Sequence, residues 1–362
     1  MENLLGCWFH QLLSFYISIN ATILRNIFNP LIHFKWQPIF VPLLDSILSV
    51  YFRYCHLQPC TLDLDMQTTL HFWTPAHRKI NKPNLVLVHG FGGNSKFQFL
   101  FQIGTLARSF NLYIPDLLFF GKSYTRSPDR TDAFQAKCLS EGLRRLGVDR
   151  YSIYGISYGG YVAYRTAAMS SEAVDKVVIL SSGIGMTEDQ KEEHLRNIGR
   201  NAVDILLPRK PADLRLLVTL SLCNCNFINW VPDYFLREFI TVMCNTIRKE
   251  KSELVEHLLA KKADSSLPIL DQGTLLIWGD KDMVFPLVCG RELHRHLGSK
   301  AKMEILENAG HAANLESSYL VNESIKAFLL NCSAKRGGCT LVERQRSSTN
   351  GLHLLNAHFT GA

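Results

Sequence analysis

The chain has 362 residues, of which 47% are hydrophobic, and 39 basic against 32 acidic residues give it a formal net charge of +7. A chain of this length and composition can bury a sizeable core, so we expect one folded domain with an insertion rather than two independent domains. The charge is modest and no basic stripe with interleaved aromatic residues is present, so nucleic-acid binding is not expected.

An apolar N-terminal extension is predicted over residues 1–58. Residues 3–24 carry no charged side chain, and large apolar residues recur at helical spacing from Leu5 to Ile23. The chain start lacks the basic region of a signal peptide, and the apolar run is barely long enough to cross a membrane. The composition fits a helix in the membrane interface or one packed over the domain. Prolines are expected to break the extension into short helices, at positions 30, 38 and 42.

The next part of the chain, residues 59–183, has the pattern of a sheet. Leu62–Leu64 and Thr69–Trp73 alternate like an antiparallel strand pair. From residue 84 onward short apolar strands alternate with glycine turns and helices, with strands near residues 85, 112, 152, 177, 274 and 303. This alternation predicts a mostly parallel sheet with helices on both faces, which continues over residues 269–331.

The alternation stops between residues 184 and 268, where leucine, lysine and glutamate recur at helical spacing. This segment is predicted to be a helical lid inserted into the domain. Its large apolar residues either face a ligand or pack onto the core: Trp230, Tyr234, Phe235, Phe239 and Met243. The last segment, residues 332–362, has few structural signals and is predicted to be a flexible basic tail.

A G-x-S-x-G motif surrounds Ser157, between the apolar run of residues 151–154 and a helical pattern. At such a strand-to-helix junction, the serine lies on a sharp turn that exposes its hydroxyl group. Two further motifs follow predicted strands downstream, namely Gly279–Asp282 with two aspartates and Gly310–His311. Serine, acid and histidine in this order, each after a strand, match one of the known orders of a catalytic triad.

The set of motifs closely resembles the α/β-hydrolase superfamily over about residues 61–330, and most of all plant hydrolases of the monoacylglycerol-lipase and ring-cleavage type. The matching motifs are 89–93, Asp116 with 121–123, 155–160, 278–282 and 310–311. The resemblance implies an α/β-hydrolase fold with an inserted lid. One position departs from the family pattern: Phe119 stands where the family often has glycine, three residues after Asp116.

Ser157 requires a base, because a hydroxyl at its free pKa is a weak nucleophile, and His311 is the candidate. A carboxylate must hold the imidazole in one tautomer. The family pattern and the apolar stretch after it favour Asp282 over Asp280. For the oxyanion hole, the resemblance and the geometry of a helix start both indicate the backbone N–H groups of Phe91 and Tyr158. Asp116 is expected to brace the loop that leads to Ser123.

The predicted activity is serine hydrolysis of a carboxylic ester or a lipid acyl ester. Two alternatives remain: carbon–carbon bond hydrolysis of the ring-cleavage type, and a ligand receptor with slow hydrolysis. No cofactor and no metal site are predicted, since Cys223 and Cys225 have no second Cys/His pair at ligand spacing. The ten scattered cysteines indicate reduced thiols in an intracellular protein. The expected partner is a small apolar or lipid-like ester, with peripheral membrane contact through the N-terminal extension.

Overall fold

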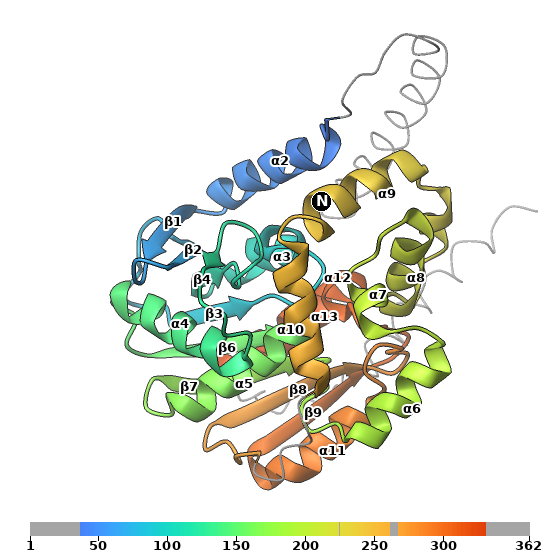
Figure 1. The fold of residues 1–362 in the computed structure, drawn as a ribbon. Coiled ribbons are helices and arrows are strands. Elements are labelled where there is room, and N and C mark those ends of the chain that lie inside the picture. The colour runs from blue at the N-terminus through green and yellow to red at the C-terminus, as the bar shows by residue number, and fades with distance from the viewer. Residues whose placement is uncertain (1–36, 224, 261–266, 331–362) are drawn as a thin grey trace, which may run out of the picture. The chain divides into compact units, whose positions relative to one another are not determined.

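The computed structural model describes residues 37–223, 225–260 and 267–330. The apolar stripe from Leu5 to Ile23 and the basic tail lie outside these ranges. A nine-stranded sheet forms the centre of the described chain (Figure 1). Its strands are β1 (Leu57–Asp63), β2 (Thr68–Pro75), β3 (Asn84–Val88), β4 (Asn111–Pro115), β5 (Tyr124–Thr125), β6 (Tyr151–Ile156), β7 (Val174–Leu180), β8 (Gly273–Gly279) and β9 (Ala301–Leu306).

The strands follow the order β1-β2-β4-β3-β6-β7-β8-β9, and the short β5 pairs with β2. The strands from β4 to β9 in this order pair in parallel, whereas β1, β2 and β5 pair antiparallel. The predicted antiparallel pair is therefore β1–β2, and the predicted parallel strands are β3, β4, β6, β7, β8 and β9. The fold is an α/β-hydrolase fold, as the motifs predicted.

Helices cover both faces of the sheet because successive strand residues point to opposite sides. Val86 and Val88 lie in one core cluster, and Leu85 and Leu87 lie in the other. Residues of α4 (Asp132–Arg145), α5 (Tyr158–Met169) and α11 (Leu287–Leu297) complete the first cluster. Residues of α2 (Phe40–Tyr54), α3 (Ser95–Leu106), α12 (Ala313–Glu316) and α13 (Ser318–Leu329) complete the second.

Helix α2 corrects the predicted boundary at residue 58. The compact unit that holds the sheet begins at Ile39, and Phe52 of α2 is fully buried in the second core cluster. Pro42 was expected to break the chain but lies in the first turn of α2, where a missing N–H costs no helical hydrogen bond. An ion pair of 2.6 Å joins Asp45 of α2 to Lys96 of α3. Residues 39–58 are thus part of the folded domain.

Between β7 and β8 the described chain forms no strand, only helices, which we call the lid helices (Figure 1). They are α6 (Glu188–Ile198), α7 (Ala202–Leu206), α8 (Pro211–Ser221), η1 (Asn226–Trp230), α9 (Asp233–Phe239), η2 (Ile240–Cys244) and α10 (Arg248–Ala260). They have a hydrophobic cluster of their own, which includes Leu214, Leu236 and Ile240.

The large apolar residues singled out in the lid take different positions. Phe235 packs edge-on against Phe40 of α2, with ring centroids 4.8 Å apart, and Phe239 packs against Phe97. Trp230 is 85% exposed. Packing therefore explains the two phenylalanines. Helical spacing alone did not show which of these residues would be packed and which would be exposed.

The loop after β4 is built around the buried carboxylate of Asp116. Its Oδ1 accepts hydrogen bonds from the backbone and the hydroxyl of Ser95, and its Oδ2 accepts one from the backbone of Lys122. His71 Nδ1 lies 3.0 Å from the same Oδ2. Asp116 thus braces the loop that leads to Ser123, as expected, through the backbone of Lys122. The Ser123 hydroxyl itself accepts a hydrogen bond from the backbone of His71.

Phe119, in the same loop, has φ 74°, a left-handed conformation that glycine adopts without steric cost. Its ring is buried, and the Arg130 guanidinium lies 4.6 Å from the ring centroid. The loop thus keeps the shape that glycine favours. A strain of about 1–2 kcal/mol is offset by burial of a phenyl ring, whose removal typically costs about 3–5 kcal/mol.

Replacing Phe119 tests this balance. We expect Phe119→Ala to lower the free energy of unfolding by about 3–5 kcal/mol, because the ring is lost and the strain is kept. Phe119→Gly should be about 1 kcal/mol more stable than Phe119→Ala, because glycine removes the strain. Urea unfolding measures both. At Phe120, a buried neighbour without positive φ, alanine should instead be more stable than glycine. The same order at both positions would contradict the strain at Phe119.

Candidate active site

Ser157 lies at the turn between β6 and α5, with φ 55° and ψ −122°. This strained conformation for a non-glycine residue holds the side chain out of both elements. Two glycines make the turn possible. A Cβ on Gly155 would come within 2.3 Å of the Gly159 carbonyl oxygen, and one on Gly159 within 2.2 Å of the Val88 carbonyl oxygen. The G-x-S-x-G spacing is therefore required by the close approach of β6, α5 and β3.

Two backbone N–H groups are available beside Ser157. Tyr158 begins α5, so its N–H has no partner within the helix, and Phe91 lies in the turn after β3. Within the described chain neither N–H donates to a backbone carbonyl. The turn is held by the buried His89, whose Nδ1 lies 2.7 Å from the Gly90 carbonyl while its Nε2 accepts from the backbone N–H of Leu117. Burial lowers the pKa of His89, which keeps the ring neutral.

His311 is held by a buried carboxylate. Its Nδ1 lies 3.1 Å from Oδ2 of Asp282, whose side chain has no exposed surface. The other oxygen, Oδ1, accepts hydrogen bonds from the backbone N–H groups of Val284 and Phe285. The carboxylate is thus fixed on one side by the chain and presents its second oxygen to the imidazole.

Asp280, the other candidate acid, does not contact His311. Its Oδ1 accepts a long hydrogen bond of 3.3 Å from the backbone of Ala309, and its Oδ2 lies 3.4 Å from Lys281 Nζ. Asp280 therefore fastens the turn before His311 to the end of β8. The structure brings Asp282 rather than Asp280 to the imidazole.

No hydrogen bond joins Ser157 Oγ to His311 Nε2 in the described chain. Catalytic hydrogen bonds are often long without substrate and tighten when substrate binds. Phe285 contacts His311 and also lines the cavity at Ser157: the centroids of the Phe285 and His311 rings lie 5.6 Å apart.

Sequence reasoning missed Glu316, which ties the loop of His311 to the lid. Its Oε2 accepts from the backbone N–H of Gly310, and its Oε1 accepts from the backbone N–H of Cys223, both at 2.7 Å. A third bond runs from the backbone N–H of Ala312 to the carbonyl of Ser221. The two bonds that reach the lid, at Cys223 and Ser221, join residues about ninety positions apart, so no local sequence signal points to them.

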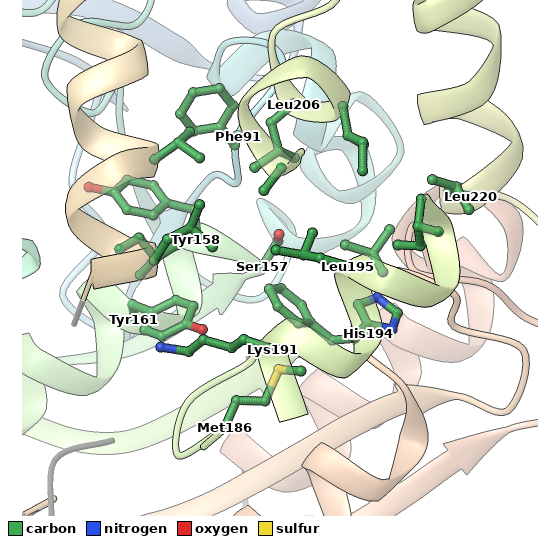
Figure 2. Close-up of a pocket in the computed structure, with 18 of the residues that line it drawn as sticks. Phe91, Ser157, Tyr158, Tyr161, Met186, Lys191, His194, Leu195, Leu206 and Leu220 are labelled. Carbon is green, nitrogen blue, oxygen red and sulfur yellow. The ribbon is translucent and has the colours of Figure 1, made fainter. Parts of the chain in front are cut away.

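A narrow cavity of about 100 Å³ opens at Ser157, between the sheet and the lid helices. Figure 2 shows Ser157 with Tyr158 and Tyr161 on one side and Leu195 and His194 on the other. The lid supplies most of the wall, which is largely aliphatic: Leu195, Ile198, Ile205, Leu206, Leu220, Leu254, Val255 and Leu258. None of the five apolar lid residues singled out in the sequence lines this cavity, so the suggestion that they face a ligand there is wrong.

Two polar side chains of α6, Lys191 and His194, also line this apolar cavity. They are one helical turn apart, so they share a face of α6. His194 Nε2 is buried and has no hydrogen-bond partner among the residues that the structure describes. A buried polar atom without a hydrogen-bond partner destabilises the folded protein, and a ligand oxygen or hydroxyl that bonds to it removes this cost.

The fold and the site define the family. A sequence model of the alpha/beta hydrolase fold matches residues 83–318, well over half of the chain, so the chain belongs to this family of hydrolases. A monoacylglycerol lipase of Mus musculus is 23% identical over 295 residues, which cover 78% of this chain and 83% of the mouse protein.

Two further comparisons extend the range of relatives. A 2-hydroxy-6-oxononadienedioate/2-hydroxy-6-oxononatrienedioate hydrolase of a Pseudomonas species is 26% identical over 220 residues, 58% of this chain and 74% of that protein. The crystal structure of a bacterial membrane phospholipase A matches with a TM-score of 0.67 and 22% identity, over 89% of this chain and 98% of that one. This last likeness shows the fold alone.

The different contacts of Asp280 and Asp282 predict different effects on hydrolysis. In Asp282→Asn the amide oxygen can keep the bonds from Val284 and Phe285, which turns the NH₂ group toward His311 and favours the wrong tautomer. We expect kcat for a chromogenic short-chain ester to fall on the order of ten-thousandfold. Asp280→Asn should lower kcat far less. The reverse ranking would move the role of the acid to Asp280.

Proposed function

We propose that this protein is a serine hydrolase that cleaves carboxylic esters or lipid acyl esters through Ser157, His311 and Asp282. One observation carries the proposal: Ser157 stands on a strained turn at the floor of an apolar cavity, and at the same edge of the sheet the loop after β9 holds a histidine on a buried carboxylate. A strained backbone conformation persists only where the surrounding structure enforces it, and it is concentrated at functional sites.

In this mechanism Ser157 Oγ attacks the ester carbonyl while His311 Nε2 takes its proton. Asp282 holds Nδ1–H and stabilises the imidazolium that forms. The carbonyl oxygen becomes an oxyanion that the N–H groups of Phe91 and Tyr158 bind, helped by the positive end of the α5 dipole. His311 then gives the proton to the leaving alcohol, and an activated water hydrolyses the acyl-enzyme by the same steps.

The cavity favours a substrate with an apolar acyl group and a polar leaving group. Its aliphatic walls suit a hydrocarbon chain, and its small volume suits a short one unless the lid helices separate. His194, with its unpartnered Nε2, supplies a hydrogen-bonding group for an alcohol such as a glycerol hydroxyl. A carboxylesterase or monoacylglycerol-lipase activity fits this arrangement, and the mouse relative carries the second name. A plant source stays a prediction from the motifs.

Carbon–carbon bond hydrolysis is the second candidate, and the Pseudomonas relative favours it. The same serine, histidine and acid would act on a ketone instead of an ester, and Lys191 and His194 would meet the polar end of that substrate. A receptor with slow hydrolysis is the third candidate. Rates on a panel of short and long acyl esters and on a vinylogous diketone acid separate these activities. Release of product in a single turnover only would favour the receptor.

Ser157→Ala tests the mechanism directly. The change removes one hydroxyl and leaves the glycine contacts of the turn intact, so we expect the melting temperature to stay within a few degrees of the wild type. We expect kcat to fall at least about a thousandfold on the best substrate of the panel. Labelling by a fluorophosphonate probe should vanish as well. Near-normal turnover in this variant would rule out the serine mechanism.

Helix α2 also supports the proposed peripheral contact with a membrane. Its outward face carries exposed apolar residues at helical spacing: Ile39, Leu43, Ile47, Val50 and Tyr54. Within α2 the only acid is Asp45, which Lys96 neutralises. Within the described ranges, no helix is long and apolar enough to cross a bilayer. An exposed apolar stripe of this kind suits a helix that lies in the membrane interface.

Flotation with phosphatidylcholine vesicles measures this contact. We expect the full-length protein to float, and the variant Leu43→Ser/Ile47→Ser/Val50→Ser to float markedly less, because it removes three side chains that enter the interface. A matched control, Met66→Ser/Ile80→Ser/Met169→Ser, changes exposed apolar residues outside α2 and should float like the wild type. A truncated chain of residues 39–362 reports the contribution of the N-terminal segment without removing Phe52 from the core. A full-length protein that stays in the soluble fraction would contradict membrane contact.

A further inference from the structure

A second cavity, of about 300 Å³, lies away from Ser157 and shares no lining residue with the first. Its walls come from three parts of the domain: Asp45 of α2, His71 and Asp116 of the sheet region, and Lys251 of the lid helix α10. Unlike the cavity at Ser157, it is lined by carboxylates as well as by basic groups, so the balance of their charges determines what can bind there.

Four basic residues line this cavity, and Lys251 is the buried one that has no ion pair within the described chain, whereas Lys96 pairs with Asp45, His71 with Asp116, and Lys122 is exposed to solvent. Lys251 is buried, with 4% of its surface exposed. Its Nζ donates to the Met243 carbonyl at 2.7 Å and lies 5.2 Å from the centroid of the Phe120 ring. No carboxylate within the described chain forms an ion pair with it. A buried ammonium without an anionic partner is costly, and burial lowers the pKa of Lys251 to about 8.

The two carboxylates of the cavity are already committed to other donors. Asp45 accepts from Lys96 Nζ through Oδ2 and from the Asn94 amide through Oδ1. Asp116 accepts from four donors through its two oxygens. Burial alone would raise the pKa of Asp116, but the hydrogen bond and charge of His71 and the hydrogen bond from the Ser95 hydroxyl lower it to about 2. Asp116 therefore stays ionised, and both carboxylates contact cations other than Lys251.

His71 supplies a second unused polar atom. Its Nδ1 is held by Asp116, and its Nε2 is buried without a hydrogen-bond partner in the part of the chain that the structure describes. The His71 side chain is 4% exposed. When Nε2 carries a proton, the ring can donate to an anion while Asp116 balances the charge of the ring. Lys251 of the lid and His71 of the sheet both line this cavity, so a ligand bound in it can meet both.

We propose that this cavity binds a carboxylic acid, with its carboxylate at Lys251 and His71 and its hydrocarbon part against the apolar wall. One buried ammonium without a counter-charge matches a monoanion better than a doubly charged phosphate, because the other cation at this cavity without an ion pair in the described chain, Lys122, is exposed and solvated. The wall beside it is apolar, with Trp73, Val242 and Ile247. Carboxylic acids are also the products that ester hydrolysis releases. A role of the site in sensing product rests on the proposed function, whereas binding does not.

Thermal unfolding of the full-length protein with sodium octanoate, octanamide or inorganic phosphate tests the proposal. We expect octanoate to raise the Tm by about 2–4 °C at a concentration well above its Kd, and the neutral amide and phosphate to raise it less. Lys251→Met should lose the effect of octanoate. Its Tm without ligand should not fall below that of the wild type, because the variant removes a buried unpaired charge. Lys249→Met, on the same helix with a side chain that is 85% exposed, should keep the effect.

A second variant keeps the test decisive if Lys251→Met folds poorly. Thr246 is exposed at the edge of the cavity, so Thr246→Trp should fold and should block entry. It should abolish the octanoate shift. The proposal is overturned if Lys251→Met or Thr246→Trp responds like Lys249→Met, or if octanamide or phosphate stabilises the wild type as much as octanoate. These shifts require no turnover, so they stand apart from the loss of hydrolysis expected for Ser157→Ala.

Discussion

The tight turn at Ser157 is the constraint on which the site depends. Gly155 and Gly159 let β6 and α5 approach the end of β3 so closely that no Cβ fits at either position. That approach places the N–H of Tyr158 and the turn of Phe91 beside one hydroxyl. The positive φ of Ser157 is sustained by parallel pairing of β6 with β3 and β7 on its two sides. The sheet thus holds Ser157 in a conformation that an isolated peptide would avoid.

The loop of His311 is held by residues that are distant in the chain, and one of its contacts is with the lid segment. His311 stands on a loop that Glu316 fastens to Cys223 and that Asp282 holds from the end of β8. A movement of the lid helices would therefore act on the loop of the imidazole as well as on the cavity wall. Charge-assisted bonds to a carboxylate are stronger than neutral ones, so this coupling favours lid and histidine loop moving together.

The sequence predicted what local patterns encode. Apolar runs ending in glycine turns located the strands, and the motifs after them predicted a site at Ser157, Asp282 and His311, because parallel strands end at one edge of a sheet. Long-range packing was beyond such patterns. The sequence assigned α2 to an extension. It could not show that Phe52 is buried, because that burial depends on contacts with residues of α3 and β2 that are distant in the chain. The lining of both cavities combines residues from helices far apart in the chain, and helical spacing alone does not tell which neighbour a side chain meets.

The described chain contains two buried His–Asp pairs with almost the same nitrogen–oxygen distance, 3.0 and 3.1 Å, but their surroundings differ. Asp282 accepts two backbone hydrogen bonds through Oδ1 and presents Oδ2 to His311. The His311 ring packs against Phe285, which also lines the cavity at Ser157. Asp116 receives four donors, and the hydroxyl groups nearest to its pair are already engaged: Ser95 donates to Asp116 and Ser123 accepts from the backbone of His71. Among the described residues both hydroxyls beside the His71 pair are engaged and Lys251 lines the same cavity, so this pair suits the binding of a charged group, whereas the role that we propose for the His311 pair is proton transfer.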